Sequence, residues 1–542
     1  MPVKFVDMIY KRADIDDIRT KYDALTAKLK NADNADTVFE ALAGHEELSS
    51  QFETMASLCY IRHTIDTRDE FYEKENDFYD ESEPLFREKA QEFFMALYGS
   101  PYRAAVEERF GKVMFDNLEM QLRSFSPEVI PELQEENRLV SEYGKLTASA
   151  QIEFDGKTLN LSQLGAYRTD PDRDVRKRAM YANGKFFADN REKLDELYDR
   201  LVKLRAEIAR KLGYDSFIPL AYDRRGRNCY DAGMVRNFRE QVKRDIVPIV
   251  VKLKKMQAER IGIDDMKFWD DTLSFKEGNP KPIGTPEDIM AAGRAMYHEM
   301  SEETGTFIDF MFDNGLCDLV SKPGKSVGGY CTFIPGYKSP FIFSNFNGTS
   351  GDVDVLTHEA GHAFAAYTTR DISPREIAEP TIEACEVHSM GMEMLTYPWW
   401  DKFYGSDTDR AKFNHLAEAL IFIPYGCMVD EFQHMVFEKP DATPDERAEM
   451  WKSLEAQYRP YLDFADLPCY SEGRGWQRQL HIYELPFYYI DYCLAQTTAL
   501  EFRALAMDNR DEAWKRYLEF VRAGGKYTYL GLCERAGLSN VF

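Results

Sequence analysis

The chain has 542 residues, of which 44% are hydrophobic and 30% are charged, as in a large globular protein. It carries 68 Lys and Arg against 93 Asp and Glu, for a net charge of −25. Nucleic-acid backbones and anionic membranes are bound by clustered basic residues. The composition therefore argues against both as partners.

Cysteine usage and the amino terminus bear on location. Nine cysteines are spread from Cys59 to Cys533 without a CxxC pair, which excludes a zinc ribbon, argues against a disulfide framework and suits a reducing compartment. The opening MPVKFVDMIYKRADID lacks the apolar core of a signal peptide, and no apolar run is long enough to span a membrane. We therefore expect a soluble, cytoplasmic protein.

The first part of the chain is predicted to be helical. Apolar residues recur there at the spacing of one helix face: Ile18, Tyr22, Leu25 and Leu29. Residues 67–100 continue in the same charged, helix-forming style. We place a domain boundary near residue 145, which separates an N-terminal helical region, 1–145, from a second domain, 146–542.

A β-hairpin is predicted directly after this boundary. Apolar residues alternate on both sides of Asp155-Gly156, from Ile152 to Leu161. Asp-Gly between alternating apolar residues is a strong hairpin pattern, because both residues accept a left-handed turn conformation.

Helical patterns then return. One predicted helix ends at Gly213, and another begins with Thr285 as its N-cap and Pro286 at its first position. Residues 326–346 are the least helical stretch, and we expect short strands there. Within them 341–346 forms either an edge strand that can pair with an extended peptide or a central strand without a free edge. The sequence thus predicts a mostly α fold with a small β-sheet.

The segment His358-Glu359-Ala360-Gly361-His362 reads H-E-x-x-H in a helix-compatible context. Residues four apart lie on nearly the same helix face, so both histidines can bind one metal ion, and Glu359 lies beside them, free to take a proton from water. The alternative is two histidines at this spacing by chance, which is uncommon with nine His in the chain. Because Gly361 is a poor helix former, we expect a close approach of backbone or substrate there.

A catalytic zinc site needs a third protein ligand and an open position for water. The candidates lie in and beside an acidic, helix-compatible segment: Glu379, Glu383, Glu386 and Glu393. Glu386 and Glu393 are seven residues apart and share one helix face, so one can bind metal while the other holds a ligand histidine. Glu383 lies on an adjacent face, where it can serve as a salt-bridge residue, and any one of these glutamates taken alone is more simply a surface carboxylate.

Three blocks, residues 328–364, 386–393 and 481–492, together resemble the oligoendopeptidase F branch of the thimet-oligopeptidase family, more narrowly its Pz-peptidase type. In that family a glutamate ligand follows HExxH by about two dozen residues, with a serine three places on and a second glutamate seven places on. This register falls on Glu386, Ser389 and Glu393. The resemblance implies Glu386 as the third zinc ligand and Glu393 as the carboxylate that supports a ligand histidine.

The same resemblance implies a large, mostly helical metallopeptidase fold with a deep substrate channel, one Zn²⁺ per chain at its floor, and the small sheet beside the HExxH helix. Residues 146–542 form the catalytic domain in this interpretation, and 1–145 contributes to the channel. His481 and nearby tyrosines are implied as donors to the oxyanion of the transition state. Tyr489 and Tyr492 are three residues apart and converge on a helix, and Tyr488 competes with them for this role.

The predicted function is zinc-dependent hydrolysis of short peptides, with Glu359 as the base. Among enzymes, the alternative is a carboxypeptidase or dipeptidyl carboxypeptidase, which needs a cationic clamp for a free carboxylate, and the sequence singles none out. From another class, the alternative is a non-catalytic peptide-binding protein, against which the retained Glu359 argues because metal binding requires only the histidines. The oligomeric state is left open.

Overall fold

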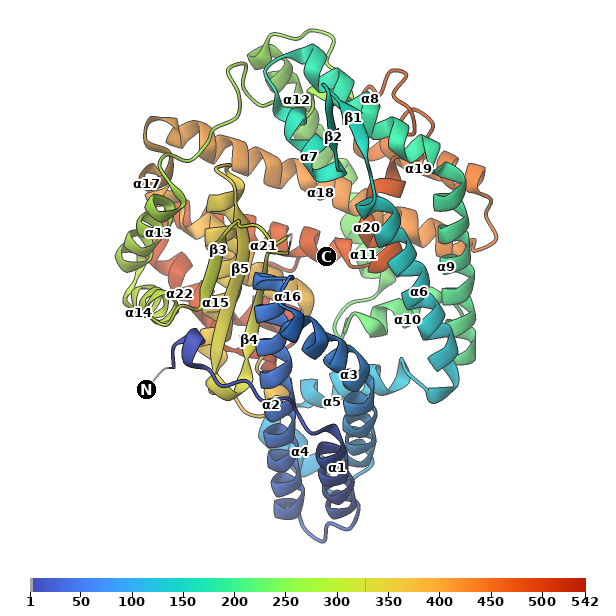
Figure 1. Cartoon of the computed structure of the whole chain (residues 1–542), viewed down its shortest axis with the longest axis vertical. Coiled ribbons are helices and arrows are strands. Elements are labelled where there is room, and N and C mark those ends of the chain that lie inside the picture. Colours follow the sequence, from blue (N-terminus) through green and yellow to red (C-terminus); the bar gives the residue numbers. More distant parts are fainter. Residues whose placement is uncertain (1–2, 327) are drawn as a thin grey trace. The chain divides into compact units, whose positions relative to one another are not determined.

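The computed structural model describes residues 3–326 and 328–542. These residues form twenty-three α-helices and five short strands, so the prediction of a mostly α fold is confirmed (Figure 1). The chain divides into two compact units. Unit 1 comprises the chain up to Leu122, Lys281–Thr408 and Thr498–Asn540, and unit 2 comprises Arg123–Pro280, Asp409–Thr497 and Val541–Phe542.

The helices that lie wholly or mainly in unit 1 are α1 (Ile15–Lys30), α2 (Ala35–Ile65), α3 (Glu70–Tyr98), α4 (Arg103–Phe110), α5 (Lys112–Arg123), α13 (Pro286–Met300), α14 (Glu302–Asp313), α15 (Gly351–Thr369), α16 (Ile382–Leu395), α17 (Asp401–Tyr404), α22 (Arg510–Arg522) and α23 (Tyr529–Arg535). Those in unit 2 are α6 (Ile130–Ala148), α7 (Leu161–Gly165), α8 (Arg173–Asp189), α9 (Arg191–Lys211), α10 (Phe217–Arg224), α11 (Ala232–Gln241), α12 (Val247–Ile261), α18 (Thr408–Glu438), α19 (Pro444–Tyr458) and α20 (Leu480–Glu484). Helix α21 (Tyr489–Asp508) has residues in both units.

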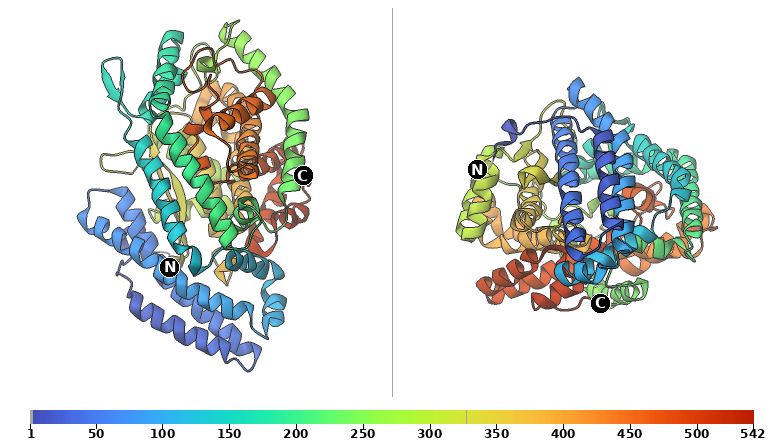
Figure 2. Two further views of the ribbon diagram at one scale, coloured as in Figure 1. Left: turned by 90° about the vertical axis from the view of Figure 1, so that its right-hand side faces the viewer. Right: turned by 90° about the horizontal axis from the view of Figure 1, so that it is seen from below.

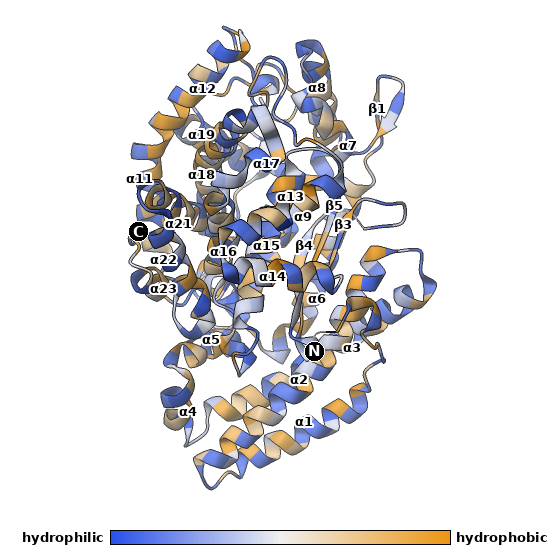
Figure 3. Ribbon diagram, turned by 90° about the vertical axis from the view of Figure 1, so that its left-hand side faces the viewer, coloured by the Kyte–Doolittle hydropathy of each residue, from blue (hydrophilic) through white to orange (hydrophobic). Residues whose placement is uncertain are grey.

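Helices α1, α2 and α3 of unit 1 lie side by side (blue in Figures 1 and 2). Hydrophilic and hydrophobic residues alternate along α1 (Figure 3), and its apolar stripe faces a core shared with α2 and α3. Ile18, Tyr22 and Leu29 are buried and Leu25 is partly buried, which confirms the predicted helix. The N-cap at Thr285 is also confirmed, since its side chain accepts a hydrogen bond from Asp288 N at the start of α13.

A three-stranded sheet lies beside α15. Its strands are β3 (Cys317–Val320), β4 (Tyr330–Ile334) and β5 (Ser339–Phe346), in the order β3-β5-β4, with β5 parallel to β3 and antiparallel to β4. Short strands were predicted in 326–346, where residue 327 lies outside the described residues. Because β5 is paired on both sides, the edge-strand interpretation of 341–346 is wrong. Helix α15 packs on β4 and β5, so the expected small sheet does lie next to the HExxH helix.

In unit 2, strands β1 (Ile152–Phe154) and β2 (Lys157–Leu159) form the predicted antiparallel hairpin. Asp155 and Gly156 have φ values of 49° and 74°, the left-handed turn that Asp-Gly favours. Helix α9 ends at Lys211, just before Gly213 at φ 83°, as expected of a helix stop. Among the helices of the described chain, none is both long and apolar enough to cross a lipid bilayer.

Candidate active site

Helices α15 and α16 of unit 1 carry the predicted metal ligands and cross in close contact. A methyl group added at Gly361 would lie 2.6 Å from the backbone oxygen of His388 and 2.7 Å from Cα of Ser389. Only glycine permits this approach, and it explains why a poor helix former stands between the two histidines. At the start of α15, Asp352 accepts hydrogen bonds from the backbone N–H groups of Asn347 and Gly348, at 2.9 and 2.8 Å.

The approach of the two helices brings three ligand atoms together. His358 Nε2 and His362 Nε2 each lie 3.6 Å from Glu386 Oε2, and all three ligand atoms are within 4.8 Å of one another. The imidazole rings stand at 80° to each other with centroids 5.1 Å apart. Their side chains are 26% and 22% exposed, whereas that of Glu386 is 8% exposed. The cluster can therefore hold an ion and still admit a small ligand.

Two further side chains of α16 orient these ligands. Glu393 Oε1 lies 2.5 Å from His358 Nδ1, so the ring nitrogen remote from the cluster is hydrogen bonded and Nε2 points at the cluster. Ser389 Oγ donates to Glu386 Oε2 at 3.2 Å. Metal-binding imidazoles are usually held in this way by a carboxylate, which fixes both tautomer and ring orientation.

Electrostatics favour a positive charge at the cluster. Burial lowers the pKa of His358, but the hydrogen bond with Glu393 and the charges of Glu393, Glu386 and Glu359 raise it, for a net rise to about 9. Burial raises the pKa of Glu386, but His362 and His358 outweigh burial and lower it. The carboxylates thus attract a cation to this point, and a metal ion competes with the proton for the imidazole nitrogens.

Other carboxyl and thiol side chains near the motif have different surroundings. Glu383 is fully buried and accepts a hydrogen bond from Thr381 at 2.7 Å. It is not in the His-His-Glu group found among the described residues. Glu359 is half-buried on α15. Burial raises the pKa of the Cys331 and Cys385 thiols well above its usual range, so both stay protonated and unreactive.

The predicted oxyanion donors gather within unit 2. The His481 ring has centroid distances of 5.8 Å to Tyr488, 4.9 Å to Tyr489 and 6.2 Å to Tyr492. Tyr492 is 5.1 Å from Tyr488 and 5.8 Å from Tyr489. The structure therefore brings all four rings together at the start of α21.

His481 is held by Gln479, which is in turn held by Tyr425, and the sequence indicated neither contact. Tyr425 on α18 donates to Gln479 Oε1 at 2.8 Å, and Gln479 Nε2 lies 2.8 Å from His481 Nδ1. With the amide N–H donating, Nδ1 is the acceptor and Nε2 carries the proton. Burial, helped by the charge of Arg225, lowers the pKa of His481 to about 4, so the ring is a neutral donor at ordinary pH. Gln479 is two residues from His481, but Tyr425 is 56 residues away, and no local pattern connects it.

A mostly helical chain whose HExxH histidines meet a glutamate of a second helix has the construction of a zinc-type metallopeptidase. The comparisons with known proteins agree. A model of peptidase family M3 matches residues 166–540, and a model of the peptidase M3 N-terminal domain matches residues 5–125. The chain belongs to peptidase family M3, and it is a metallo-oligopeptidase.

Known relatives support this assignment over nearly the whole chain. A solved structure of Pz peptidase A with an inhibitor is 47% identical, with a TM-score of 0.93 over 99% of this chain and 96% of that one. Oligopeptidase PepF of Bacillus subtilis is 21% identical over 94% of this chain and 78% of its own length. Oligoendopeptidase F from Enterococcus faecium, at 14% identity and a TM-score of 0.65 over 97% of this chain and 93% of that one, shares the fold. The resemblance to the oligoendopeptidase F branch is thereby confirmed.

Proposed function

We propose that this chain cleaves peptide bonds within short peptides, using one zinc ion per chain held by His358, His362 and Glu386. The observation that carries the proposal is the convergence of three ligand atoms within 4.8 Å, from two helices in close contact. Two imidazoles and one carboxylate are a ligand set of catalytic zinc sites, which keep a further position open. When bound there, zinc supplies a Lewis acid that polarises a carbonyl group and lowers the pKa of water.

Glu359 is the proposed general base and acid. It directly follows the first proposed ligand on α15, and its charge contributes to the raised pKa of His358. An ionised carboxylate accepts a proton from the attacking water and returns it to the nitrogen of the leaving amine. Glu393 takes no proton in this scheme. It keeps the Nε2 of His358 directed at the ligand cluster through its bond to Nδ1.

His481, Tyr489 and Tyr492 are the proposed donors to the oxyanion. The proposal rests on the resemblance and on the clustering of these rings with Tyr488 in unit 2. The Gln479 contact, which leaves the proton on His481 Nε2, makes the imidazole a donor that needs no positive charge. Hydrogen bonds that strengthen as charge develops lower the barrier for peptide cleavage.

We also propose that residues 146–542 form the catalytic domain and that the protein is cytoplasmic, with peptides rather than nucleic acid or membranes as partners. The two family matches leave 126–165 between them, an interval that contains the expected boundary at 145. All nine cysteines are free thiols, as suits a reducing compartment. The net charge of −25 disfavours polyanionic partners.

The test is a matched pair of substitutions on α16. Glu386→Gln removes a ligand oxygen's charge, so metal content and peptide cleavage should fall together. Glu383→Gln changes an equally buried carboxylate outside the ligand group and should leave metal bound. Metal is measured by elemental analysis after gel filtration, and cleavage with one fluorogenic peptide. Loss of zinc from the Glu383 variant, with retention in the Glu386 variant, would show that the third ligand is wrongly assigned.

A further inference from the structure

A cavity of about 320 Å³ lies within unit 2, and none of the proposed metal ligands or oxyanion donors is among its lining residues. One wall comes from α12 and the segment after η5 (Phe268–Asp270), and includes Lys254, Arg260 and Asp271. A second part of the lining comes from α18, with Phe422 and Tyr425. Arg459 and Arg478 complete the lining. Four cations thus face one cavity of a chain whose net charge is −25.

Two of these cations have carboxylate partners. Lys254 Nζ lies 2.6 Å from Asp271 Oδ1, and Arg459 Nε donates to Glu455 Oε2 at 2.8 Å. The remaining carboxyl group of the lining, Glu418, accepts from Asn414 Nδ2 at 3.0 Å, and burial raises its pKa, which favours the neutral form. The cavity therefore keeps a surplus of positive charge.

That surplus belongs to Arg260 and Arg478. Arg260 is held in place, because its Nε donates to Ser274 O at 2.5 Å and its guanidinium lies 4.8 Å and 5.0 Å from the ring centroids of Phe275 and Phe413. Arg478 is half-buried, and within the described chain its one protein hydrogen bond is a long contact of 3.5 Å with the Tyr425 hydroxyl. A guanidinium has five N–H donors. Most of those of Arg478 are thus left for a ligand.

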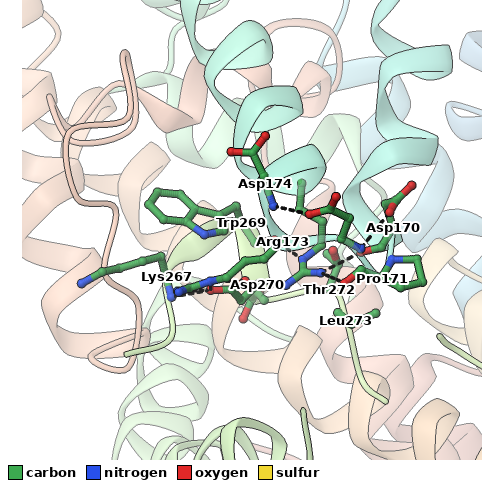
Figure 4. A network of polar contacts seen from close by, with 12 residues as sticks. Asp170, Pro171, Arg173, Asp174, Lys267, Trp269, Asp270, Thr272 and Leu273 are labelled. Atoms are coloured by element: carbon green, nitrogen blue, oxygen red, sulfur yellow. Dashed lines mark hydrogen bonds and ion pairs between the residues drawn. The ribbon is translucent and has the colours of Figure 1, made fainter. Parts of the chain in front are cut away.

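A salt-bridge network around Asp270 lies directly beside the segment that contributes Asp271 and Thr272 to the cavity lining (Figure 4). Asp270 is fully buried and accepts from Arg173 Nη2 at 2.8 Å and from Arg176 Nη2 at 2.7 Å. Next to it, Thr272 Oγ1 donates to the backbone oxygen of Arg168 at 2.7 Å. Burial and the nearby charge of Arg478 lower the pKa of Arg168, a second arginine close to Arg478. The network therefore holds the segment that carries two residues of the cavity lining, Asp271 and Thr272, and such support of a binding residue is what anion recognition requires.

The cavity shares a wall with the proposed oxyanion donors. Phe422 and Tyr425 line it, and their rings lie 5.5 Å and 5.8 Å from the ring of Tyr489. The Tyr425 hydroxyl also holds Gln479, the partner of His481. A substrate group in the cavity would therefore lie next to the donors, within the same unit.

We propose that this cavity binds a carboxylate group of the substrate peptide, with the Arg478 guanidinium as its anchor and Arg260 as the supporting charge. The inference rests on the proposed peptidase function and deepens it. Arginine suits this role because its planar fork binds both oxygens of a carboxylate. The carboxylate is supplied either by the carboxyl terminus of the peptide or by an Asp or Glu side chain. Arg478 is in this view a specificity-determining residue and takes no part in the chemistry.

The experiment compares matched fluorogenic peptides on the zinc-loaded enzyme. One pair differs only in a free or amidated carboxyl terminus, and a second series exchanges Asp for Asn at each position flanking the cleaved bond. Removing the recognised carboxylate should raise KM on the order of tenfold in the wild type. In Arg478→Gln the ratio between the paired peptides should fall to about one, and Arg478→Lys should keep part of it. The pair that responds identifies which carboxylate is bound.

Lys185→Gln is the control. It removes one positive charge from unit 2 at an exposed residue of α8 that pairs with Asp189, and it should keep the wild-type ratio. Equal kinetics for all paired peptides in the wild type, or an equal ratio in wild type and Arg478→Gln, would overturn the inference. If no peptide is cleaved at all, the proposed peptidase function is wrong, but the carboxylate inference is not yet decided. Calorimetric titration of the paired, uncleaved peptides then decides the inference, since only carboxylate-dependent binding that Arg478→Gln removes supports it.

Discussion

The contact at Gly361 gives the sharpest prediction for the metal site. In Gly361→Ala the added methyl would meet His388 O at 2.6 Å and Ser389 Cα at 2.7 Å, while real Cβ atoms almost never come closer than 3.0 Å. Both partners are backbone atoms, so no rotamer change relieves the clash. Helices α15 and α16 must instead separate by roughly half an ångström or more, a displacement at the limit of what a preorganised site tolerates.

Two opposite effects on the free energy of unfolding partly cancel each other in this variant. Alanine is a better helix former than glycine by about 1 kcal/mol, whereas overpacking a core costs about 1–3 kcal/mol. We therefore expect a net destabilisation of at most about 2 kcal/mol. The metal site has no such compensation, because Glu386 must stay 3.6 Å from both imidazoles and Glu393 must keep its bond to His358. Disturbing ligand support typically costs 10–100-fold in metal affinity, so zinc binding should weaken by about tenfold or more.

The assay is competition for zinc with a chromophoric chelator, beside thermal unfolding and peptide cleavage. Gly144→Ala is the matched control, because this glycine lies inside α6 and its nearest contact to an added methyl is 3.9 Å. The control should be neutral or stabilised by about 1 kcal/mol, with unchanged zinc affinity. Wild-type zinc affinity and cleavage in Gly361→Ala would refute the argument that this glycine sets the ligand geometry.

Three further predictions concern the base, the oxyanion donors and acid stability. Glu359→Gln should keep stoichiometric zinc and bind peptide, yet lose several orders of magnitude in kcat, because the water loses its proton acceptor; substantial residual turnover would remove the assigned role. Tyr492→Phe should lower kcat by about 10²–10³ with little change in Tm, and full activity would move the role to Tyr488 or Tyr489. His434 is buried, and its pKa is lowered to about 4, mainly by burial. Between about pH 6.5 and about pH 4, the imidazole is therefore protonated in the unfolded state but not in the folded state. Stability is lost as the pH falls through this range. Between pH 7 and pH 5, the free energy of unfolding should therefore fall by about 2 kcal/mol less in His434→Gln than in the wild type. Equal falls in a pH series of unfolding curves would contradict this.

Elements determined by neighbouring residues were predictable from the sequence. The hairpin at Asp155-Gly156, the stripe of α1 and the cap at Thr285 each depend on residues within one or two turns of chain. The sheet order depends on a distant partner, β3, whose four residues show no strand pattern of their own. The apolar composition of 341–346 already favoured a central strand over an edge strand, since an apolar run buried on both faces is typical of a central strand.

The residues of the candidate site also fall into those that local spacing predicts and those that depend on distant contacts. The two histidines of HExxH were predictable, because helix geometry alone brings residues four apart onto the same face. The support of His481 by Tyr425, by contrast, joins two helices through the side chain of Gln479, and such a contact exists only once the chain has folded.

The cavity lined by Lys254, Arg260, Arg459 and Arg478 shows why the proposed carboxylate-binding residue could not be found from the sequence. The chain has 68 Lys and Arg, and no local pattern separates a cation that serves a ligand from one that serves the fold. Arg459 has its partner four residues earlier on α19, whereas Lys254 has its partner on the segment after η5. Arg478 stands out only when these pairs have been formed and its own guanidinium still lacks a carboxylate. The feature that marks a binding residue is here an unmet hydrogen-bonding capacity facing a cavity, a property of the folded arrangement and of no single stretch of sequence.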